Sequence, residues 1–336
     1  MSALTKTGAA EARPRSGRRF YTTQEFILLM LLIIEIAVFV AAVPAARQPR
    51  VYFDLLRELS PNLIAVVGIA LLMIGGDFDL TPGAVMAATG VVCVTVMNLT
   101  GSLAVGVVAG LLVGPVIGLI LGYLVTRQKM TSLMTSLGMM FALRGAVYVS
   151  TNKQAVTPTV AESAQNAFIA IFQGSLGPIP VPAILALVIV AAWIFISTQT
   201  EFGRRIFAVG GNAQAARVSG IKVERMKLLL FVLAGITSAI AGILMASNVG
   251  AGYYDAGLGF ELILVTAVVL GGVSLNGGEG SLWGAVLGVL ILGVSSKAMR
   301  MMSVVTTTQL VVTGVIMMLA VYLHGLRKQL LQRKQP

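Results

Sequence analysis

The sequence predicts an all-α fold, a polytopic transmembrane helical bundle of about ten spans with short helices broken by glycine. Two features of the composition support this fold: hydrophobic residues make up 57% of the 336 residues, and charged residues only 11%. Soluble domains carry roughly 25% charged residues, and a soluble globule of this size cannot cover its surface with so few. The composition therefore excludes a cytosolic enzyme, a disordered chain and a secreted disulfide scaffold.

The pattern of apolar runs is the third observation. A helix needs about 20 apolar residues to cross the hydrocarbon core of a bilayer. Ten runs are candidates: 26–43, 62–76, 80–97, 103–125, 131–149, 181–197, 228–247, 262–274, 282–296 and 309–323. They are continuous, whereas the strands of a barrel alternate over about 10 residues. Several are short and interrupted by glycine, so we expect tilted or broken helices, or neighbouring runs that merge. Within one run, Gly114, Gly118 and Gly122 predict a face for close helix packing.

The distribution of basic residues orients the bundle. If the N-terminus is cytoplasmic and all ten runs cross, most of the 24 Lys and Arg residues lie in cytoplasmic segments. The main exception is the stretch that holds Arg47, Arg50 and Arg57. We expect cytoplasmic tails over 1–25 and 324–336, with the membrane domain between them. The first run is longer than the apolar part of a usual signal peptide, so we expect it to be retained.

The remaining composition excludes several kinds of site. The formal net charge is +11, but the charges lie between apolar runs, where they face anionic membrane lipid rather than nucleic acid. Cys93 is the single cysteine and His324 the only histidine, so we expect no intrachain disulfide and no histidine-based metal site. The sequence lacks a phosphate-binding G-x-x-x-x-G-K-[ST] loop and the H-E-x-x-H and G-x-S-x-G motifs, which disfavours an ATPase or an intramembrane enzyme.

The longest polar stretch predicted to face the cytoplasm is 201–227, EFGRRIFAVGGNAQAARVSGIKVERMK. Gly210, Gly211 and Asn212 form a turn signal. Asn212 is suited to cap a short helix over 213–218, and Gly220 to end it. Two interpretations are open: a handle on which a partner protein pushes, or a solvated loop.

Two glycine-rich breaks interrupt the apolar pattern. The first, GGDFDLTPG over 75–83, carries Asp77 and Asp79, and Pro82 suits the first turn of the following helix. The second spans 271–284, and the pieces LLMIGGDFDL and AVVLGGVSLN form a weak internal repeat. Short, glycine-broken segments in matching places indicate a transport pathway. Carboxylates near membrane depth are costly and usually face protein, water or substrate; alternatively, these two cap helix ends in the headgroup region.

Three further charged residues lie in or beside apolar runs. Arg144 and Glu35 lie well inside runs, while Glu261 lies at the head of one. Each is equally suited to a buried structural ion pair or to a role with substrate. The sequence does not determine which of them meet.

Four blocks, in order, resemble bacterial ABC-transporter permeases of the ribose/xylose/galactose type. They are GGDFDLTPGAVMAATG, LVTRQKMTSLMTSLGMMFALRGAVYVSTN, the 201–227 stretch continued by LLLFVLAGITSAIAGILMAS, and GFELILVTAVVLGGVSLNGGEGSLWGAVLGVLILG. The resemblance runs from about residue 62 to 323. The first block departs from the family's Ile-Asp-Leu-Ser-Val-Gly, with Phe78 at its start and Pro82 in place of Val, which leaves the sugar undetermined.

The resemblance implies a permease subunit of a monosaccharide importer in the bacterial inner membrane. Its partners would be a second permease subunit (identical or related), an ATP-binding cassette ATPase that holds the ATP and Mg, and a periplasmic sugar-binding protein. This chain itself would bind no cofactor and catalyse no reaction. The resemblance assigns the ATPase-coupling role within 201–227 to Gly203, Arg204, Gly210, Gly211, Asn212, Ala216 and Gly220.

A neutral polar solute is expected to meet polar groups beside the broken helices. The candidate pathway residues are Asn62, Asp77, Asp79, Thr81, Asn248, Glu261 and Asn276. The main alternative is a stand-alone secondary transporter, in which Asp77 or Glu35 carries a coupling ion. A membrane enzyme and an exporter are weaker alternatives, the first because its motifs are missing and the second because the resemblance is to importers.

Overall fold

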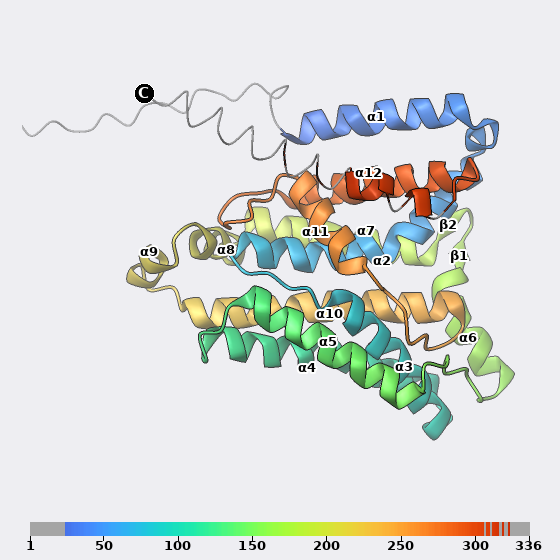
Figure 1. Cartoon of the computed structure of the whole chain (residues 1–336), viewed down its shortest axis with the longest axis horizontal. Coiled ribbons are helices and arrows are strands. Elements are labelled where there is room, and N and C mark those ends of the chain that lie inside the picture. Colours follow the sequence, from blue (N-terminus) through green and yellow to red (C-terminus); the bar gives the residue numbers. More distant parts are fainter. Residues whose placement is uncertain (1–23, 306, 310, 316–317, 319–321, 323–336) are drawn as a thin grey trace, which may run out of the picture.

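The computed structural model describes residues 24–305, 307–309, 311–315, 318 and 322 (Figure 1). Nearly all of this part of the chain is helical, and its one sheet is a two-stranded hairpin. The elements of the first half are α1 (Gln24–Ala42), η2 (Pro44–Arg47), α2 (Pro49–Ile74), α3 (Pro82–Thr100), α4 (Leu103–Thr126), α5 (Ser132–Thr151) and α6 (Glu162–Gln173). Those of the second half are β1 (Ser175–Leu176), β2 (Ile179–Pro180), α7 (Val181–Gln199), α8 (Glu201–Gly211), α9 (Ala213–Val218), α10 (Val223–Val249), α11 (Phe260–Leu270) and α12 (Leu282–Met301).

The predicted all-α membrane fold is confirmed. Within the described residues, eight helices are long and apolar enough to cross a membrane, namely α1, α2, α3, α4, α5, α7, α10 and α12. A ninth predicted run corresponds to α11, which has 11 residues and is too short to span. Seven of the fifteen residues of the tenth run, 309–323, lie outside the described residues, as do the tails over 1–23 and 324–336 with His324.

One predicted boundary is wrong, because the run expected over 62–76 begins at Pro49 as helix α2. Proline suits the first turn of a helix, where its missing N–H is not needed. The polar residues that follow support one another, since Asp54 lies 3.9 Å from both Arg50 and Arg57. These local ion pairs place a carboxylate beside Arg50 and Arg57, two of the basic residues that depart from the charge bias.

Glycine on α4 allows three helices to approach closely, as its spacing of four predicts. A Cβ atom on Gly114 would lie 2.1 Å from the carbonyl oxygen of Gly235 on α10. Gly118 meets the same helix at the Phe231 carbonyl, and Gly110 meets α3 at the Thr89 carbonyl. The backbones therefore pack against each other with no side chain between them.

Helices α3 and α11 both begin in the middle of the bundle rather than at its edge. In Figure 1 the connection between α2 and α3 runs back along the bundle before α3 starts, and the connection between α10 and α11 does the same from the opposite end. The two starting points touch, because a Cβ atom on Gly83 would lie 2.1 Å from the Gly257 carbonyl oxygen. We call residues 250–259, which lead into α11, the re-entrant loop.

Candidate functional site

The segment 201–227 lies at one end of the bundle, where Figure 1 shows α8 and α9 beyond the ends of the long helices. The short helix predicted after Asn212 is confirmed as α9, with Asn212 Oδ1 accepting a hydrogen bond of 2.9 Å from the Ala215 N–H. Gly220 follows in the left-handed conformation, with φ +84°. The preceding helix α8 was not predicted, although Ile206 and Val209, both buried, have helical spacing.

The predicted coupling residues divide into two groups. Gly203 and Ala216 are buried, and a Cβ atom on Gly203 would lie 2.1 Å from the Ser197 carbonyl oxygen. The exposed residues are Arg204, Gly211, Asn212 and Gly220. Beside them lies Val218, an apolar residue with 84% of its surface exposed, which the sequence analysis did not single out. The exposed group and Val218 are therefore accessible at this end of the bundle.

Gly210 lies against both glycine-rich breaks. A Cβ atom on it would lie 1.8 Å from the Ile74 carbonyl oxygen and 2.6 Å from the Gly278 nitrogen. Those two atoms are themselves joined, since the Gly278 N–H donates to the Ile74 oxygen at 2.8 Å. We name this contact the glycine joint, and it comprises Gly76, Gly210, Gly211, Gly277 and Gly278. Main chain from α2, α8 and the α11–α12 connection meets here without intervening side chains.

The two breaks begin with the same backbone turn, which also ends α9 and α12. At the end of α2, the N–H groups of Gly75, Gly76 and Asp77 donate to the carbonyls of Leu71, Met73 and Leu72 at 3.0, 3.0 and 3.2 Å. At the end of α11, the N–H groups of Gly271, Gly272 and Val273 donate to the carbonyl oxygens of Ala267, Val269 and Val268, respectively, at 2.9, 2.9 and 3.1 Å. The second glycine of each break has a positive φ, +87° and +86°, which other residues rarely adopt.

Polar contacts fix the first break in place. Asp77 Oδ2 lies 2.9 Å from Lys227 Nζ on α10, and the Phe78 N–H donates to Ser132 Oγ on α5 at 3.2 Å. Asp79 Oδ1 accepts hydrogen bonds from the N–H and hydroxyl of Thr81, at 2.8 and 2.7 Å, directly before α3 begins. Asp77, Asp79 and Thr81 are buried and line neither of the cavities described below.

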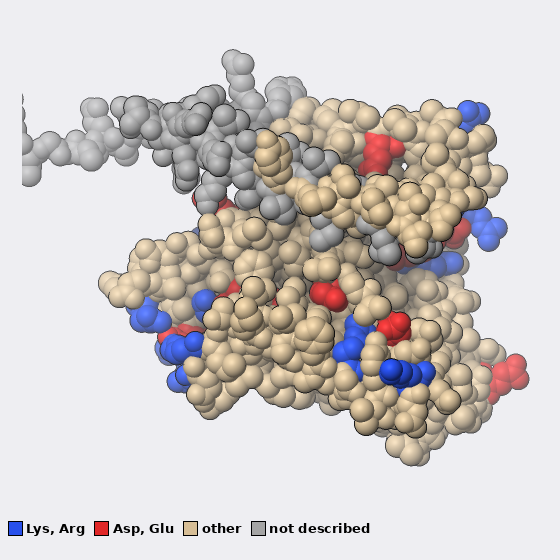
Figure 2. Space-filling view, in the orientation of Figure 1, with Lys and Arg blue, Asp and Glu red and all other residues tan. Residues whose placement is uncertain are grey.

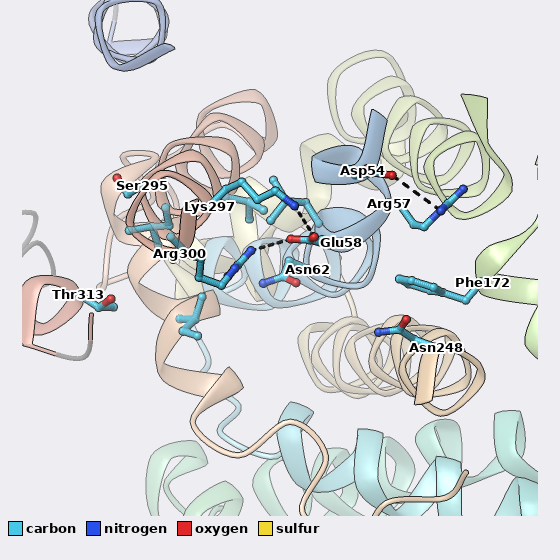
Figure 3. A pocket seen from close by; sticks show the side chains of 16 residues that line it. Asp54, Arg57, Glu58, Asn62, Phe172, Asn248, Ser295, Lys297, Arg300 and Thr313 are labelled. Carbon is cyan, nitrogen blue, oxygen red and sulfur yellow. Dashed lines mark hydrogen bonds and ion pairs between the residues drawn. The ribbon is translucent and has the colours of Figure 1, made fainter. Parts of the chain in front are cut away.

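The first cavity has a volume of about 600 Å³ and lies at the end of the bundle opposite α8 and α9. Asn62 of α2 and Asn248 of α10, both predicted pathway residues, line it. Figure 3 shows Glu58 between Lys297 and Arg300, whose nitrogens each lie 2.6 Å from one of its carboxylate oxygens. These three residues were missed because Glu58 and Lys297 are 239 positions apart in the sequence.

A second cavity of about 370 Å³ lies between α3, α10 and the re-entrant loop. Ile263 of α11 lines both cavities, so they are neighbours. Neither Glu261 nor Asn276 lines either of them. Glu261 is buried beside Gly83, whose added Cβ would lie 2.4 Å from Glu261 Oε2. Asn276 lies in the connection between α11 and α12, where its N–H donates to Ser274 Oγ at 3.2 Å.

Arg144, which is buried, and Glu35, which is half-buried, contact uncharged partners. Arg144 of α5 donates to the carbonyl oxygens of Ala256 and Gly257 at 2.7 and 3.4 Å, and so holds the re-entrant loop. Glu35 of α1 accepts a hydrogen bond from the Ser295 hydroxyl of α12. These contacts are hydrogen bonds rather than ion pairs, and they join α5 to the re-entrant loop and α1 to α12.

Residues 51–321 match the family described as branched-chain amino acid transport system / permease component. The chain belongs to this family of transport permeases. Among curated relatives, the L-arabinose transport system permease protein AraH of Escherichia coli is 39% identical over 263 residues, which cover 78% of this chain and 79% of that protein. The ribose import permease protein RbsC of Escherichia coli is 34% identical, covering 91% and 96%. RbsC of Bacillus subtilis is 35% identical, covering 89% and 91%. No solved structure matches the chain.

The predicted resemblance to sugar ABC-importer permeases is thereby confirmed. The relatives favour this function over the stand-alone ion-coupled transporter considered as the alternative. A multi-pass protein of the inner membrane agrees with the family and with the eight candidate spans of the described chain.

Proposed function

We propose that this chain is the permease subunit of an ATP-binding cassette importer for a monosaccharide. The observation that carries the proposal is the match, over most of both chains, to permeases of L-arabinose and ribose import systems. The geometry agrees with it, because a cavity with two amide side chains lies at one end of the bundle and a partner surface at the other.

The α8–α9 end faces the cytoplasm in this proposal. Basic residues gather there, on the turn between α4 and α5 and along 201–227 (Figure 2, left). They include Arg127, Lys129, Arg204, Arg205, Arg217, Lys222, Arg225 and Lys227. An excess of Lys and Arg marks the cytoplasmic side of a membrane protein. The 600 Å³ cavity then opens toward the periplasm.

Solute enters through this outer cavity. Asn62 and Asn248 each supply a donor and an acceptor, which suits the hydroxyl groups of a neutral sugar. The sugar arrives from a periplasmic binding protein, and a second permease subunit, identical or related, completes the pathway. Weak binding by the permease is sufficient, because a solute held tightly would not be released.

Coupling to ATP runs through the glycine joint. A separate ATPase subunit, which holds ATP and Mg, contacts the exposed residues of α8 and α9 and moves these helices when it closes. Since Gly210 touches Ile74 and Gly278 directly, this movement reaches both glycine-rich breaks at once. The ends of α2 and α11 therefore shift together, and the pathway changes from outward-open to inward-open.

Reconstitution tests this proposal. The chain is placed in proteoliposomes with candidate ATPase and sugar-binding subunits of an ABC sugar importer from the same organism, and uptake of L-arabinose, D-ribose, D-xylose, D-galactose and D-glucose is measured. We expect uptake of at least one sugar that requires both ATP and binding protein. Uptake by the chain alone, energised by a proton or sodium gradient, would contradict the proposal.

A further inference from the structure

One tyrosine and one carboxylate line the second cavity. Tyr253 and Asp255 of the re-entrant loop line it, together with small and apolar residues of α3 and α10. Tyr253 and Tyr254 have ring centroids 5.0 Å apart, and Tyr148 of α5 meets Tyr254 edge-on at 5.6 Å. Tyr253 therefore lines an otherwise apolar space, and the rings of Tyr254 and Tyr148 support it from outside the cavity.

The carboxylate in this cluster is held in a fixed orientation. The Tyr148 hydroxyl donates to Asp255 Oδ1 at 2.9 Å, and Lys153 lies over the same tyrosine ring at 5.6 Å. Among the described residues, no hydrogen bond or ion pair occupies Asp255 Oδ2. One oxygen is therefore used to position the group, and the other remains able to accept.

The loop that carries these residues is anchored on both sides. Arg144 binds the carbonyls of Ala256 and Gly257, and Gly252 exchanges two backbone hydrogen bonds with Val156, at 2.8 and 2.9 Å. A loop held in this way presents its side chains without a further ordering cost when a ligand binds. Tyr253 keeps 41% of its surface exposed, so its ring remains accessible.

We infer that Tyr253 and Asp255 form a subsite for a single monosaccharide ring, with the C–H face of the sugar on Tyr253 and a hydroxyl donating to Asp255. The inference rests on the proposed function and names where in this chain the sugar is recognised. The chemistry of the cluster fits, since a sugar ring presents both an apolar face and a row of hydroxyl donors. The volume of about 370 Å³ is at the small end of the roughly 300–1,000 Å³ of ligand pockets, which suits one ring rather than an oligosaccharide.

The position of the subsite agrees with a transport pathway that leads inward from the outer cavity. The cavity borders the outer cavity at Ile263 and lies beside the point where α3 and α11 begin. A sugar that leaves Asn248 in the outer cavity would reach Tyr253 next. The glycine-rich breaks lie beyond it, toward the α8–α9 end.

Binding and uptake by the complete transporter complex test the inference. In nanodiscs, binding of the five sugars named above is followed by saturation-transfer NMR at millimolar concentration, and in proteoliposomes uptake is followed with loaded binding protein. Tyr253→Ala is expected to weaken both by about tenfold through loss of the aromatic contact. Asp255→Asn, which keeps the shape of the side chain, is expected to weaken both by at least tenfold through loss of a charged acceptor.

Two controls separate recognition from folding. Tyr253→Phe keeps the ring and is expected to stay within about twofold of wild type. Tyr123→Ala removes a tyrosine of similar exposure, 51%, that lines neither cavity, and is expected to change nothing. Basal ATPase activity of the complex is expected to equal that of wild type in Tyr123→Ala.

Two results overturn the inference. If binding and uptake are unchanged in both Tyr253→Ala and Asp255→Asn while wild type imports sugar, the subsite is wrong but the proposed function is not affected. If wild type neither binds nor imports any of the five sugars, the proposed function fails as well.

Discussion

The Lys227 ammonium group lies 2.9 Å from Asp77 Oδ2 and joins the start of α10 to the connection between α2 and α3. Only 21% of the lysine side chain and 7% of the aspartate side chain are exposed. Removal of one partner of such a buried pair leaves an uncompensated charge and costs about 3 kcal/mol. We therefore expect the purified Asp77→Asn variant to unfold at a markedly lower temperature than wild type.

Two further variants check this interpretation. The double variant Asp77→Asn with Lys227→Met should lose less stability than the two single changes summed, because no charge is stranded. Glu201→Gln breaks the exposed pair with Arg205 and should have little effect. Additive losses in the double variant would argue that the two groups do not interact.

The two neighbouring glycines at the end of α8 predict different effects of the same substitution. An added Cβ on Gly210 would lie 1.8 Å from the Ile74 carbonyl oxygen. An added Cβ on Gly211 would have its nearest neighbour at 3.9 Å. Gly210→Ala is expected to reduce ATP-driven uptake at least tenfold while the ATPase still co-purifies and hydrolyses ATP. Gly211→Ala adds no such clash and should transport better than Gly210→Ala. Gly138→Ala on α5, whose added Cβ meets nothing within 4 Å, is the control outside the glycine joint and should transport normally. Equal uptake by Gly210→Ala and Gly138→Ala would rule out the glycine joint as the coupling contact.

Glu58 links α2 to α12 across the outer cavity, since it binds both Lys297 and Arg300. Glu58→Gln leaves two cations facing each other, and we expect slower uptake with an increased dependence on salt, because added ions screen their repulsion. The measurement is the initial uptake rate at low and high ionic strength. Glu162→Gln removes a carboxylate that lies outside the cavity and serves as control. A salt dependence equal to that of wild type would exclude this role for Glu58.

Glu35 and Ser295 form a polar contact between α1 and α12 at the edge of the outer cavity, which Ser295 lines. Ser295→Ala leaves the carboxyl group without its partner and is expected to cost about 1 kcal/mol. Replacement of both groups, Glu35→Met with Ser295→Ala, should recover most of that loss, because no unsatisfied polar group remains. Thermal unfolding in detergent provides the comparison. A double variant less stable than Ser295→Ala alone would contradict this account.

Local signals in the sequence predicted local structure well. Asn212 before a short polar stretch predicted α9, Pro82 predicted the start of α3, and the paired glycines predicted both breaks. Each of these depends on the backbone preferences of a few adjacent residues, which a sequence displays directly.

Features that depend on distant contacts were not predictable. No pattern relates Glu58 to Lys297, which become neighbours only after α2 packs on α12. Likewise, hydropathy predicts the length of α3 but not that it begins in the middle of the bundle, because its starting point depends on a contact with Gly257. The first turns of α2 were missed because ion pairs, rather than apolar residues, support them.

The glycine joint is built from main chain, and main chain has the same dimensions in every protein. Such a contact cannot be adjusted by degrees through exchange of side chains; it is either kept or lost. The walls of the two cavities, in contrast, consist of side chains that can change one at a time. A permease built in this way can acquire a new cargo in one half of the molecule while the way it is driven, in the other half, stays the same.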